Sequence, residues 1–440
     1  MATGVWCCEV ELGGVRDCWA PVAPEPLQGS SRVLVRLHGE PLGYLTVPGP
    51  PTDIDIAAVK AMALVEFAAR VRDHLAAEGL DPSATFTSMA APAATASCPN
   101  RANPTGLVSV VVCTRNRSDI LRSCLDRLAQ LTYPEVEILI VDNAPSDDST
   151  VRLVEHRRAS DPRFRYVREP RPGLSAARNR GVAEATGDYI AYTDDDVSVD
   201  PGWVQGLLLG FCADPAVGCV TGLVCTAGIG SAAEAYFDAR SPSWSSRVEP
   251  EMFDLADHRR DSGIYPYSAG IFGTGANFAF RRQTLAAVGS FDEALGAGTP
   301  TRGGEDLDMF VRVLRGGYAI SYQPAAIVWH HHRADDQALN TQMFGYGAGL
   351  TAYLTKCLLG RGTGREVLVR IPGGALKMLR IRRQTAARLP ASVRPPSQAW
   401  KRELAGMAAG SWLYWRSRRR GTPRPAQPAR PTGPGRGRSV

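Results

Sequence analysis

From residue 107 onward, short runs rich in β-branched residues alternate with segments of helical periodicity. This alternation is typical of βαβ units, which place parallel strands in one sheet and helices on its faces. The chain is therefore predicted to contain an α/β domain with a mostly parallel central sheet. The first predicted strands are 107–113, 136–142 and 164–168, and the helices that follow them are 119–131, 149–159 and 174–186.

Three adjacent carboxylates, Asp194, Asp195 and Asp196, end the apolar run that starts at Tyr189. Like charges this close repel, and their burial is costly unless a cation lies among them; hard divalent ions prefer oxygen ligands. Ligands of open α/β sheets bind beyond the carboxyl ends of strands, where these acids fall. The triplet therefore predicts a metal site, and a solvated acidic turn is the alternative reading of this stretch alone.

Polar residues also follow the first two predicted strands. Thr114 and Arg117 follow the first, and Asp142 ends the second. A carboxylate at a strand end can accept a hydrogen bond from a nucleobase or a ribose, and the hydroxyl and guanidinium can meet neighbouring groups. Neither a P-loop nor a G-x-G-x-x-G motif follows the first strand, so phosphate charge would be met by arginines such as Arg178 and by the metal. A turn or helix cap is the alternative role of Asp142.

Charge and cysteine usage exclude several classes of protein. The net charge is +6, but the segment 416–440 holds eight of the 50 basic residues and no acid, which leaves 42 basic against 44 acidic residues. The basic excess therefore lies in a Pro/Gly/Arg tail rather than on a folded face, and no nucleic-acid partner is expected. The ten cysteines form no C-x-x-C motif, which predicts neither a zinc cage nor a disulfide framework.

The start of the chain resembles no signal peptide, and no apolar stretch approaches the roughly 18 residues of a membrane span. A cytoplasmic protein is expected, and its basic C-terminus is a candidate contact with the inner face of the membrane. The predicted organisation is a small α+β domain at 1–90, which includes one helix over 54–78, a linker at 91–106, the α/β domain at 107–335, a helical extension at 336–415 and a disordered tail at 416–440.

The ordered motifs resemble family 2 glycosyltransferases, which have the GT-A fold, a Rossmann-like α/β fold with a mostly parallel sheet. The resemblance covers about residues 107–333. Its motifs are Thr-Arg-Asn-Arg at 114–117, Val-Asp-Asn at 141–143, Gly-Leu-Ser-Ala-Ala-Arg-Asn-Arg-Gly at 173–181, Asp-Asp-Asp at 194–196 and Gly-Gly-Glu-Asp at 303–306. The resemblance implies that Thr114, Arg117, Asp142 and Arg178 hold the nucleotide.

The resemblance also identifies the acidic triplet with the family's D-x-D motif. It implies that Asp194 and Asp196 bind Mn²⁺ or Mg²⁺ and that Asp195 faces the ribose. Members of the family often supply a metal-binding histidine after the strand predicted at 325–328, where three consecutive histidines follow Trp329. Alternate residues of an extended segment share a face, so only one or two of the three can be ligands. His332 is the first choice and His330 the second; a structural or acceptor-side role is the alternative.

Glu305 and Asp306 precede the helix predicted at 307–315. Acids at a helix N-terminus are stabilised by its dipole, so capping is one explanation of the pair. A carboxylate at a pocket mouth can also take the proton of an attacking acceptor hydroxyl, and the resemblance gives this role of base to Asp306.

The predicted activity is inverting transfer of a sugar from a nucleoside diphosphate sugar to a hydroxyl acceptor such as a glycan, a lipid-linked saccharide or a natural product. UDP or dTDP is the expected nucleotide, with GDP open. The alternatives are a nucleotide-sugar-binding module without catalysis and a nucleotidyltransferase. The Glu305–Asp306 pair favours an enzyme, and the segment 114–117 lacks the Gly-rich loop usual in nucleotidyltransferases.

Overall fold

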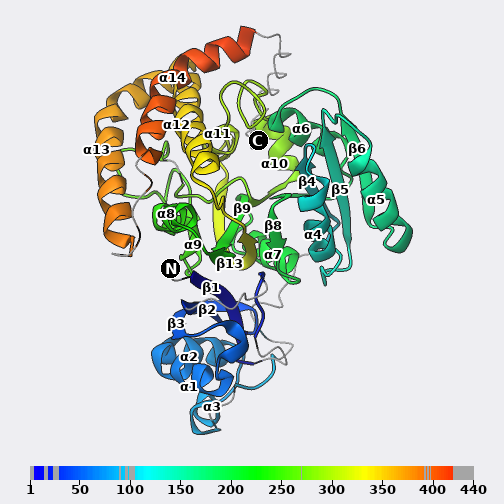
Figure 1. Cartoon of the computed structure of the whole chain (residues 1–440), viewed down its shortest axis with the longest axis vertical. Helices are drawn as coiled ribbons and strands as arrows, with labels where there is room; N and C mark the ends of the chain where they lie inside the picture. Colours follow the sequence, from blue (N-terminus) through cyan, green and yellow to red (C-terminus); the bar gives the residue numbers. More distant parts are fainter. Residues whose placement is uncertain are drawn as a thin grey trace, which may run out of the picture.

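The computed structural model of the chain describes residues 4–13, 18–22, 29–88, 91–94, 98, 105–268, 270–390, 393, 396 and 398–419. An N-terminal unit lies at the bottom of Figure 1, a larger sheet with its helices lies above it, and three C-terminal helices lie at the upper left. Most of the tail predicted to be disordered lies outside the described residues. Its first residues, 416–419, continue the last helix.

The N-terminal unit packs helices against a four-stranded sheet of order β10-β1-β2-β3. The single helix predicted over 54–78 is two helices, because Phe67 leaves helical geometry with φ −106° and ψ 23°. This break turns the Phe67 ring onto the sheet, where it lies against Gly43. The elements are β1 (Gly4–Glu11), β2 (Gly29–Leu37), β3 (Glu40–Pro48), η1 (Pro51–Asp53), α1 (Ile56–Glu66), α2 (Ala68–Ala77), α3 (Pro82–Ser88) and, from the other unit, β10 (Gly228–Ile229).

The larger sheet has nine strands in the order β11-β13-β9-β12-β7-β4-β5-β6, with β8 paired to β13. Its strands are β4 (Val108–Thr114), β5 (Val136–Asn143), β6 (Phe164–Glu169), β7 (Tyr189–Asp194), β8 (Val197–Val199), β9 (Val217–Thr226), β11 (Glu251–Phe253), β12 (Asn277–Arg281) and β13 (Ala319–His330). Its helices are α4 (Ser118–Leu128), α5 (Ser149–Ser160), α6 (Leu174–Glu184), α7 (Trp203–Cys212), α8 (Ala232–Arg240), α9 (Pro242–Ser245), α10 (Arg282–Val288) and α11 (Glu305–Arg315).

The strands β7, β4, β5 and β6 are parallel, as the βαβ pattern predicts, whereas β12 runs antiparallel between β7 and β9. Alternate side chains of β4 enter two different cores, with Val110 and Val112 on one face and Val111 on the other. Both faces of the sheet are therefore covered, and the carboxyl ends of the parallel strands remain as its accessible edge.

Two arginines of β2 join the N-terminal unit to the larger one. Arg36 donates from Nη1 to Glu9 at 3.0 Å and to Asp200 at 2.7 Å. Arg32 donates to both carboxylate oxygens of Asp238 on α8, at 2.8 and 2.9 Å. The pairing of β1 with β10 adds backbone hydrogen bonds to these charge-assisted contacts. The two units are thus connected by side chains and by a shared sheet.

The C-terminal helices α12 (Asp336–Leu359), α13 (Gly364–Arg388) and α14 (Ala399–Arg419) pack beside α11 (Figure 1). Glycines let α12 and α14 approach closely: a Cβ on Gly347 would lie 2.0 Å from the Glu403 carbonyl oxygen. A Cβ on Gly304, which precedes α11, would lie 2.4 Å from the Gly349 carbonyl oxygen of α12. Gly304 also has a φ of +92°, a conformation that strongly favours glycine. The start of α11 is therefore held directly against α12.

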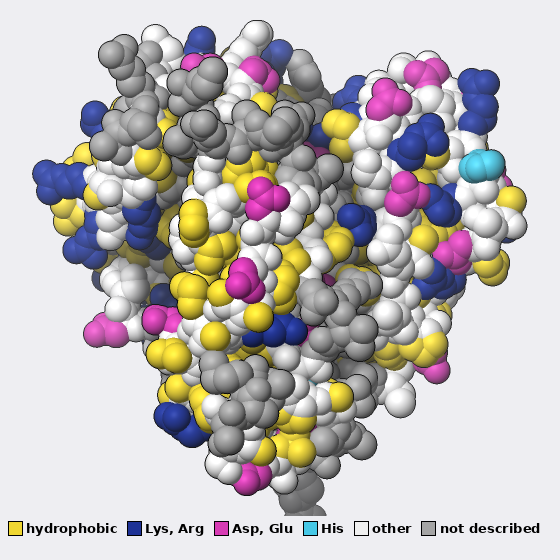
Figure 2. All heavy atoms as spheres, turned by 60° about the horizontal axis from the view of Figure 1, so that its bottom comes forward, with side chains coloured by type: hydrophobic (Ala, Val, Ile, Leu, Met, Phe, Trp, Pro, Cys, Tyr) yellow, Lys and Arg dark blue, Asp and Glu magenta, His cyan; other side chains and the backbone are white. Residues whose placement is uncertain are grey.

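Among the described helices, none combines the length and the apolar composition needed to cross a bilayer. Figure 2 shows the face on which the N-terminal unit comes forward. Hydrophobic side chains lie there among charged ones, and Lys and Arg side chains gather towards both sides of the view.

Candidate active site

The ends of three neighbouring strands bring the predicted polar residues to one edge of the sheet. Thr114 of β4 is in register with Asp142 of β5, and Cys113 of β4 is in register with Asp194 of β7. Because these strands are parallel, their carboxyl ends meet on the same side, where ligands of α/β sheets bind. Thr114, Asp142 and the acidic triplet that follows β7 therefore lie together.

Asp195 is held by the last residue of β4 and by a residue that follows this strand. Thr114 donates from Oγ1 to Asp195 at 2.7 Å, and Arg117 donates from Nη1 at 2.5 Å. The other terminal nitrogen of Arg117 donates to Asp196 at 3.0 Å. Arg117 therefore bridges two members of the triplet, and Thr114 fixes the orientation of Asp195.

Asp142 is fully buried at the end of β5. Its Oδ2 accepts a hydrogen bond from Tyr166 at 3.0 Å, whereas its Oδ1 has no donor among the described residues. Burial raises the pKa of this carboxyl above its ordinary value. A buried acceptor without a protein donor is costly, so the geometry suits a ligand that supplies an N–H or O–H group.

The triplet carries the electrostatic signature of a cation site. Burial and the neighbouring Asp196 raise the pKa of Asp194 to about 8. Burial also raises the pKa of Asp195 to about 6. Burial acts in the same direction on Asp196, but His330, Arg117 and Arg333 outweigh it, and the pKa of Asp196 is lowered. A divalent cation would relieve the repulsion between Asp194 and Asp196, so the donor set fits Mn²⁺ or Mg²⁺.

Arg178 of α6 connects the triplet to the start of α11. Its guanidinium is almost fully buried and donates to Glu305 Oε1 at 3.0 Å and to the Gly275 carbonyl oxygen at 2.9 Å. It also lies 3.8 Å from Asp194 and stacks over the Phe278 ring at 5.1 Å. The second oxygen of Glu305 is buried without a donor among the described residues. Burial raises the pKa of Glu305, and Arg178 opposes that rise.

Asp306 is half-buried in the first turn of α11. Its Oδ2 accepts a hydrogen bond from the Gly275 backbone N–H at 3.0 Å, and its Oδ1 accepts from the Leu307 N–H at 2.8 Å. Gly275 thus contacts both Arg178 and Asp306, since its carbonyl oxygen accepts from the former. Asp194, Arg178, Glu305 and Asp306 form one continuous set of contacts.

The histidines that end β13 are ordered by a chain of hydrogen bonds. Thr226 donates from Oγ1 to Asp238 at 2.6 Å, so its oxygen accepts from His332 Nε2 at 3.0 Å. His332 Nδ1 then accepts from His330 Nδ1 at 3.0 Å, and His330 Nε2 lies 3.6 Å from Asp196. A proton on Nε2 would face the Asp196 carboxylate, and its release to bind a metal ion would direct a lone pair of His330 towards the triplet.

The structure therefore places His330, rather than His332, nearest to the carboxylates of the triplet. Burial lowers the pKa of His332 to about 3, which keeps its ring neutral in this chain of hydrogen bonds. Because alternate residues of a strand share a face, His330 and His332 lie on the same side. The direction of the hydrogen bond between them follows only from the contact of Thr226 with Asp238.

Three further residues contact the site: Tyr166 and Arg333, which were not predicted, and Glu305, which was predicted only as the neighbour of Asp306 with no role of its own. Tyr166 contacts Asp142, Glu305 contacts Arg178, and Arg333 donates to Asp196 at 3.0 Å. Glu305 precedes Asp306 and Arg333 follows the histidines, so position in the motifs could have indicated both. Tyr166 has no motif of its own, and only the pairing of β5 with β6 brings it near Asp142.

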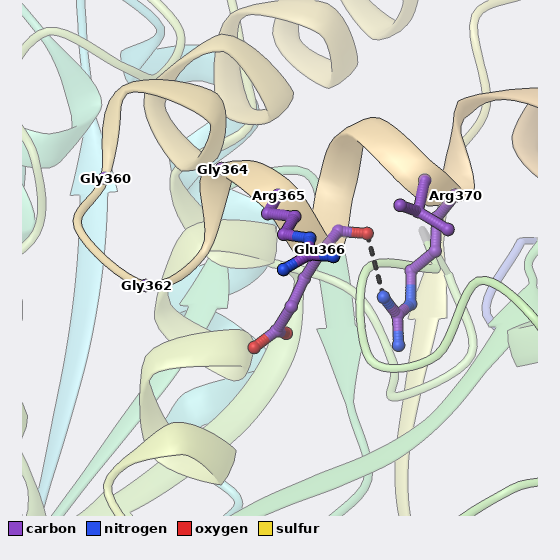
Figure 3. A pocket seen from close by; sticks show the side chains of 7 residues that line it. Gly360, Gly362, Gly364, Arg365, Glu366 and Arg370 are labelled. Atoms are coloured by element: carbon purple, nitrogen blue, oxygen red, sulfur yellow. Dashed lines mark hydrogen bonds between the residues drawn. The ribbon is translucent and has the colours of Figure 1, made fainter.

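A separate hollow of about 590 Å³ opens at the start of α13 (Figure 3). The dashed line in Figure 3 marks the hydrogen bond that Arg370 Nη1 donates to the Glu366 carbonyl oxygen at 2.8 Å. None of the candidate active-site residues lines it. The lining residues are Gly360, Gly362, Gly364, Arg365, Glu366, Val369 and Arg370.

Comparison with known proteins gives a family match that lies within the larger unit. Residues 109–285 match the family model described as "Glycosyl transferase family 2". The chain is 28% identical over 236 residues to a pre-mycofactocin glycosyltransferase of Mycobacterium tuberculosis, a match that covers 51% of this chain and 43% of that protein. It is 24% identical over 285 residues to an N-acetylglucosaminyltransferase of Sinorhizobium fredii, a match that covers 60% of this chain and 65% of that protein.

Among solved structures, the mannosyltransferase PcManGT from Pyrobaculum calidifontis, in complex with GDP-Man and Mn²⁺, aligns with a TM-score of 0.45 and 18% sequence identity. The alignment covers 82% of this chain and 99% of that one.

Proposed function

Because residues 109–285 form a family 2 glycosyltransferase domain, we propose that this chain transfers a sugar, with inversion, from a nucleoside diphosphate sugar to a hydroxyl acceptor. The mixed α/β sheet and the family match agree with the predicted GT-A fold. One observation carries the proposal: contacts run without interruption from Thr114 and Asp195 at one side of the site, through Asp194 and Arg178, to Asp306 at the other.

Asp142 and Asp195 would bind the nucleoside, with Thr114 and Arg117 beside them. The free buried oxygen of Asp142 suits a base N–H, and the expected bases are those of UDP or dTDP. Asp194, Asp196 and His330 would hold Mn²⁺ or Mg²⁺, whose charge would stabilise the departing diphosphate. His332 would act behind His330 by fixing its tautomer.

Asp306 would remove the proton of the acceptor hydroxyl as that oxygen attacks the anomeric carbon from the side opposite the leaving group. The N–H groups of Gly275 and Leu307 fix the carboxylate of Asp306. Arg178 is deeply buried and its guanidinium already donates to Glu305, so we assign it no direct contact with the diphosphate. Its role would be to position Asp194 and Glu305 and to balance their charge.

A donor screen tests this proposal. In the presence of Mn²⁺, the matching nucleoside diphosphate sugar is expected to raise the melting temperature of the full chain. EDTA or Asp196→Ala should weaken donor affinity by roughly tenfold or more, which removes about 1.4 kcal/mol of ligand stabilisation. Isothermal titration of the same donor would measure the change directly.

Asp188→Ala is the matched control for Asp196→Ala. Asp188 is exposed and precedes the other end of β7, so the same side-chain truncation there should leave donor affinity unchanged. Equal donor affinity of Asp196→Ala and Asp188→Ala with Mn²⁺ would contradict the assigned metal site. Failure of UDP, dTDP and GDP sugars alike to bind would contradict the proposed function itself.

A peripheral contact with anionic membrane would give the enzyme access to lipid-linked acceptors. On α13, Leu368, Leu376 and Leu379 are exposed, and their successive spacings of eight and three residues place them on one face of the helix. Arg365 and Arg383 are exposed at helical spacing on the same face and supply charge complementary to anionic headgroups. We propose that this face of α13 lies on the lipid surface.

Flotation with vesicles that contain anionic lipid measures this contact. Leu376→Glu should reduce the vesicle-bound fraction by roughly tenfold. Insertion of a leucine side chain into lipid contributes about 1.5 kcal/mol or more, and the new negative charge is repelled by the anionic lipid surface. Val65→Glu, at an exposed position of α1, should leave binding unchanged. Equal flotation of both variants, or no flotation of the wild-type chain, would exclude the contact.

A further inference from the structure

The N-terminal unit contains a second group of metal-ligand side chains, formed by His38, His74, Glu78 and Cys98. One ligand atom from each lies within 4.8 Å of those of the others. His38 lies in the turn between β2 and β3, His74 and Glu78 lie one turn apart at the end of α2, and Cys98 lies between α3 and β4. We propose that these four residues bind a zinc ion.

The distances from His74 Nε2 to the other ligand atoms are close to the edges of a small tetrahedron. His74 Nε2 lies 3.1 Å from His38 Nδ1, 3.1 Å from Glu78 Oε1 and 3.7 Å from Cys98 Sγ. Ordinary zinc–ligand bond lengths in tetrahedral geometry give edges of roughly 3.3–3.6 Å. His38 Nδ1 and Glu78 Oε1 are in closer, hydrogen-bonded contact, and a zinc ion would move these two side chains apart.

The outer ring nitrogens carry protons, which leaves the inner ones as the ligand atoms. His38 Nε2 lies 2.8 Å from the Pro92 carbonyl oxygen, which can only accept, so Nε2 carries a proton. His74 Nδ1 lies 2.6 Å from a Glu40 carboxylate oxygen and carries a proton for the same reason. The inner nitrogens both contact the Glu78 carboxylate, so in the metal-free chain a proton is shared there. Metal binding would release that proton and leave a lone pair on each inner nitrogen.

The surroundings of the group are those of a built metal site. Ligand histidines usually donate their second N–H to a carboxylate or a backbone carbonyl, as His74 and His38 do here. Glu11 accepts hydrogen bonds from the backbone N–H groups of His38 and Gly39, at 2.8 and 3.0 Å, and so fixes the turn. His38 holds a φ of +51° in that turn, an uncommon conformation for a residue other than glycine.

The donor set selects the type of metal. Two imidazoles, one thiolate and one carboxylate suit zinc, whereas Mg²⁺ and Mn²⁺ prefer oxygen ligands. Four protein ligands and near-complete burial of all four side chains leave no open position for a substrate, so the zinc would be structural. It would fasten the β2–β3 turn, α2 and the segment that leads to β4.

Metal analysis of the purified full chain tests the proposal without any variant. After exposure to zinc and removal of the excess, the wild-type chain should retain about one zinc ion per chain, measured by plasma mass spectrometry. Cys98→Ser and His74→Gln should lose most of it. Co²⁺ in place of zinc should give a thiolate charge-transfer band that Cys98→Ser lacks.

The matched controls are Cys212→Ser and His156→Gln, which make the same changes at exposed positions and should keep the zinc. If a ligand variant fails to fold, Glu40→Gln leaves all four ligands in place and should weaken zinc affinity by roughly 10-fold to 100-fold. Asp196→Ala should retain the zinc, which separates this site from the proposed catalytic one. A wild-type chain with no more bound zinc than Cys98→Ser would overturn the proposal and leave a hydrogen-bonded cluster only.

Discussion

Asp306→Asn is expected to lower sugar transfer by roughly 10²-fold to 10⁴-fold while donor affinity is kept. The substitution preserves the size of the side chain but removes the basic oxygen that would take the acceptor proton. Asn can still accept one of the two backbone hydrogen bonds that fix Asp306, from Gly275 or from Leu307. Transfer assays under saturating donor and direct titration of the donor separate the two effects.

Asp336→Asn is the matched control for this variant. Asp336 is an exposed carboxylate in the first turn of α12, so it has the same place relative to a helix dipole but lies at the surface. Its substitution should leave transfer unchanged. Full activity of Asp306→Asn, or a loss of donor affinity equal to the loss of transfer, would contradict the role of Asp306 as base.

Arg178→Met is expected to lower the free energy of unfolding by roughly 3–5 kcal/mol, because it leaves the buried Glu305 carboxylate without its cation. Asp194, at 3.8 Å, loses the same positive charge. The double variant Arg178→Met/Glu305→Gln should recover part of the loss, since no uncompensated charge then remains at Glu305. Urea denaturation followed by tryptophan fluorescence measures the free energy of unfolding of the wild-type chain and of both variants.

Arg180→Met provides the comparison on the same helix. Arg180 is nearly half exposed and, among the described residues, forms an ion pair with Glu184 alone, one turn away, so its loss should change stability by less than about 0.5 kcal/mol. If Arg178→Met were as stable as Arg180→Met, or if the double variant showed no recovery, the buried pair would not have the energetic role given to it here.

The sequence was sufficient to predict the fold of the larger unit and the edge of the sheet at which the candidate site residues meet. Thr114, Asp142 and Asp194 end parallel strands, and strand period and strand direction together determine that such residues meet at one edge. Asp306 could be predicted from its motif, but the contact through Gly275 that joins it to Arg178 could not. That contact depends on how the segment before β12 approaches α11, and no local sequence pattern predicts this approach.

Other features depend on tertiary contacts and had no sequence signal. The helix predicted over 54–78 is interrupted at Phe67. Hydrophobic periodicity continues through this residue, and the break results from packing of the Phe67 ring against the sheet at Gly43. His332 was predicted as a metal ligand because the sequence does not indicate its hydrogen bond to Thr226. The cysteines predicted no zinc site because the proposed ligands come from three separate segments rather than from a paired motif.

The pairing of Arg32 with Asp238 has a consequence for the evolution and engineering of this chain. Asp238 accepts from Thr226, which orders His332 and His330, so a residue of β2 influences the imidazole nitrogen that faces Asp196. The two units cannot be exchanged between relatives as independent modules. A chimera that takes the first 90 residues from another protein must carry an arginine at the same point of its second strand, or the imidazole nearest the acidic triplet loses the support that sets its tautomer.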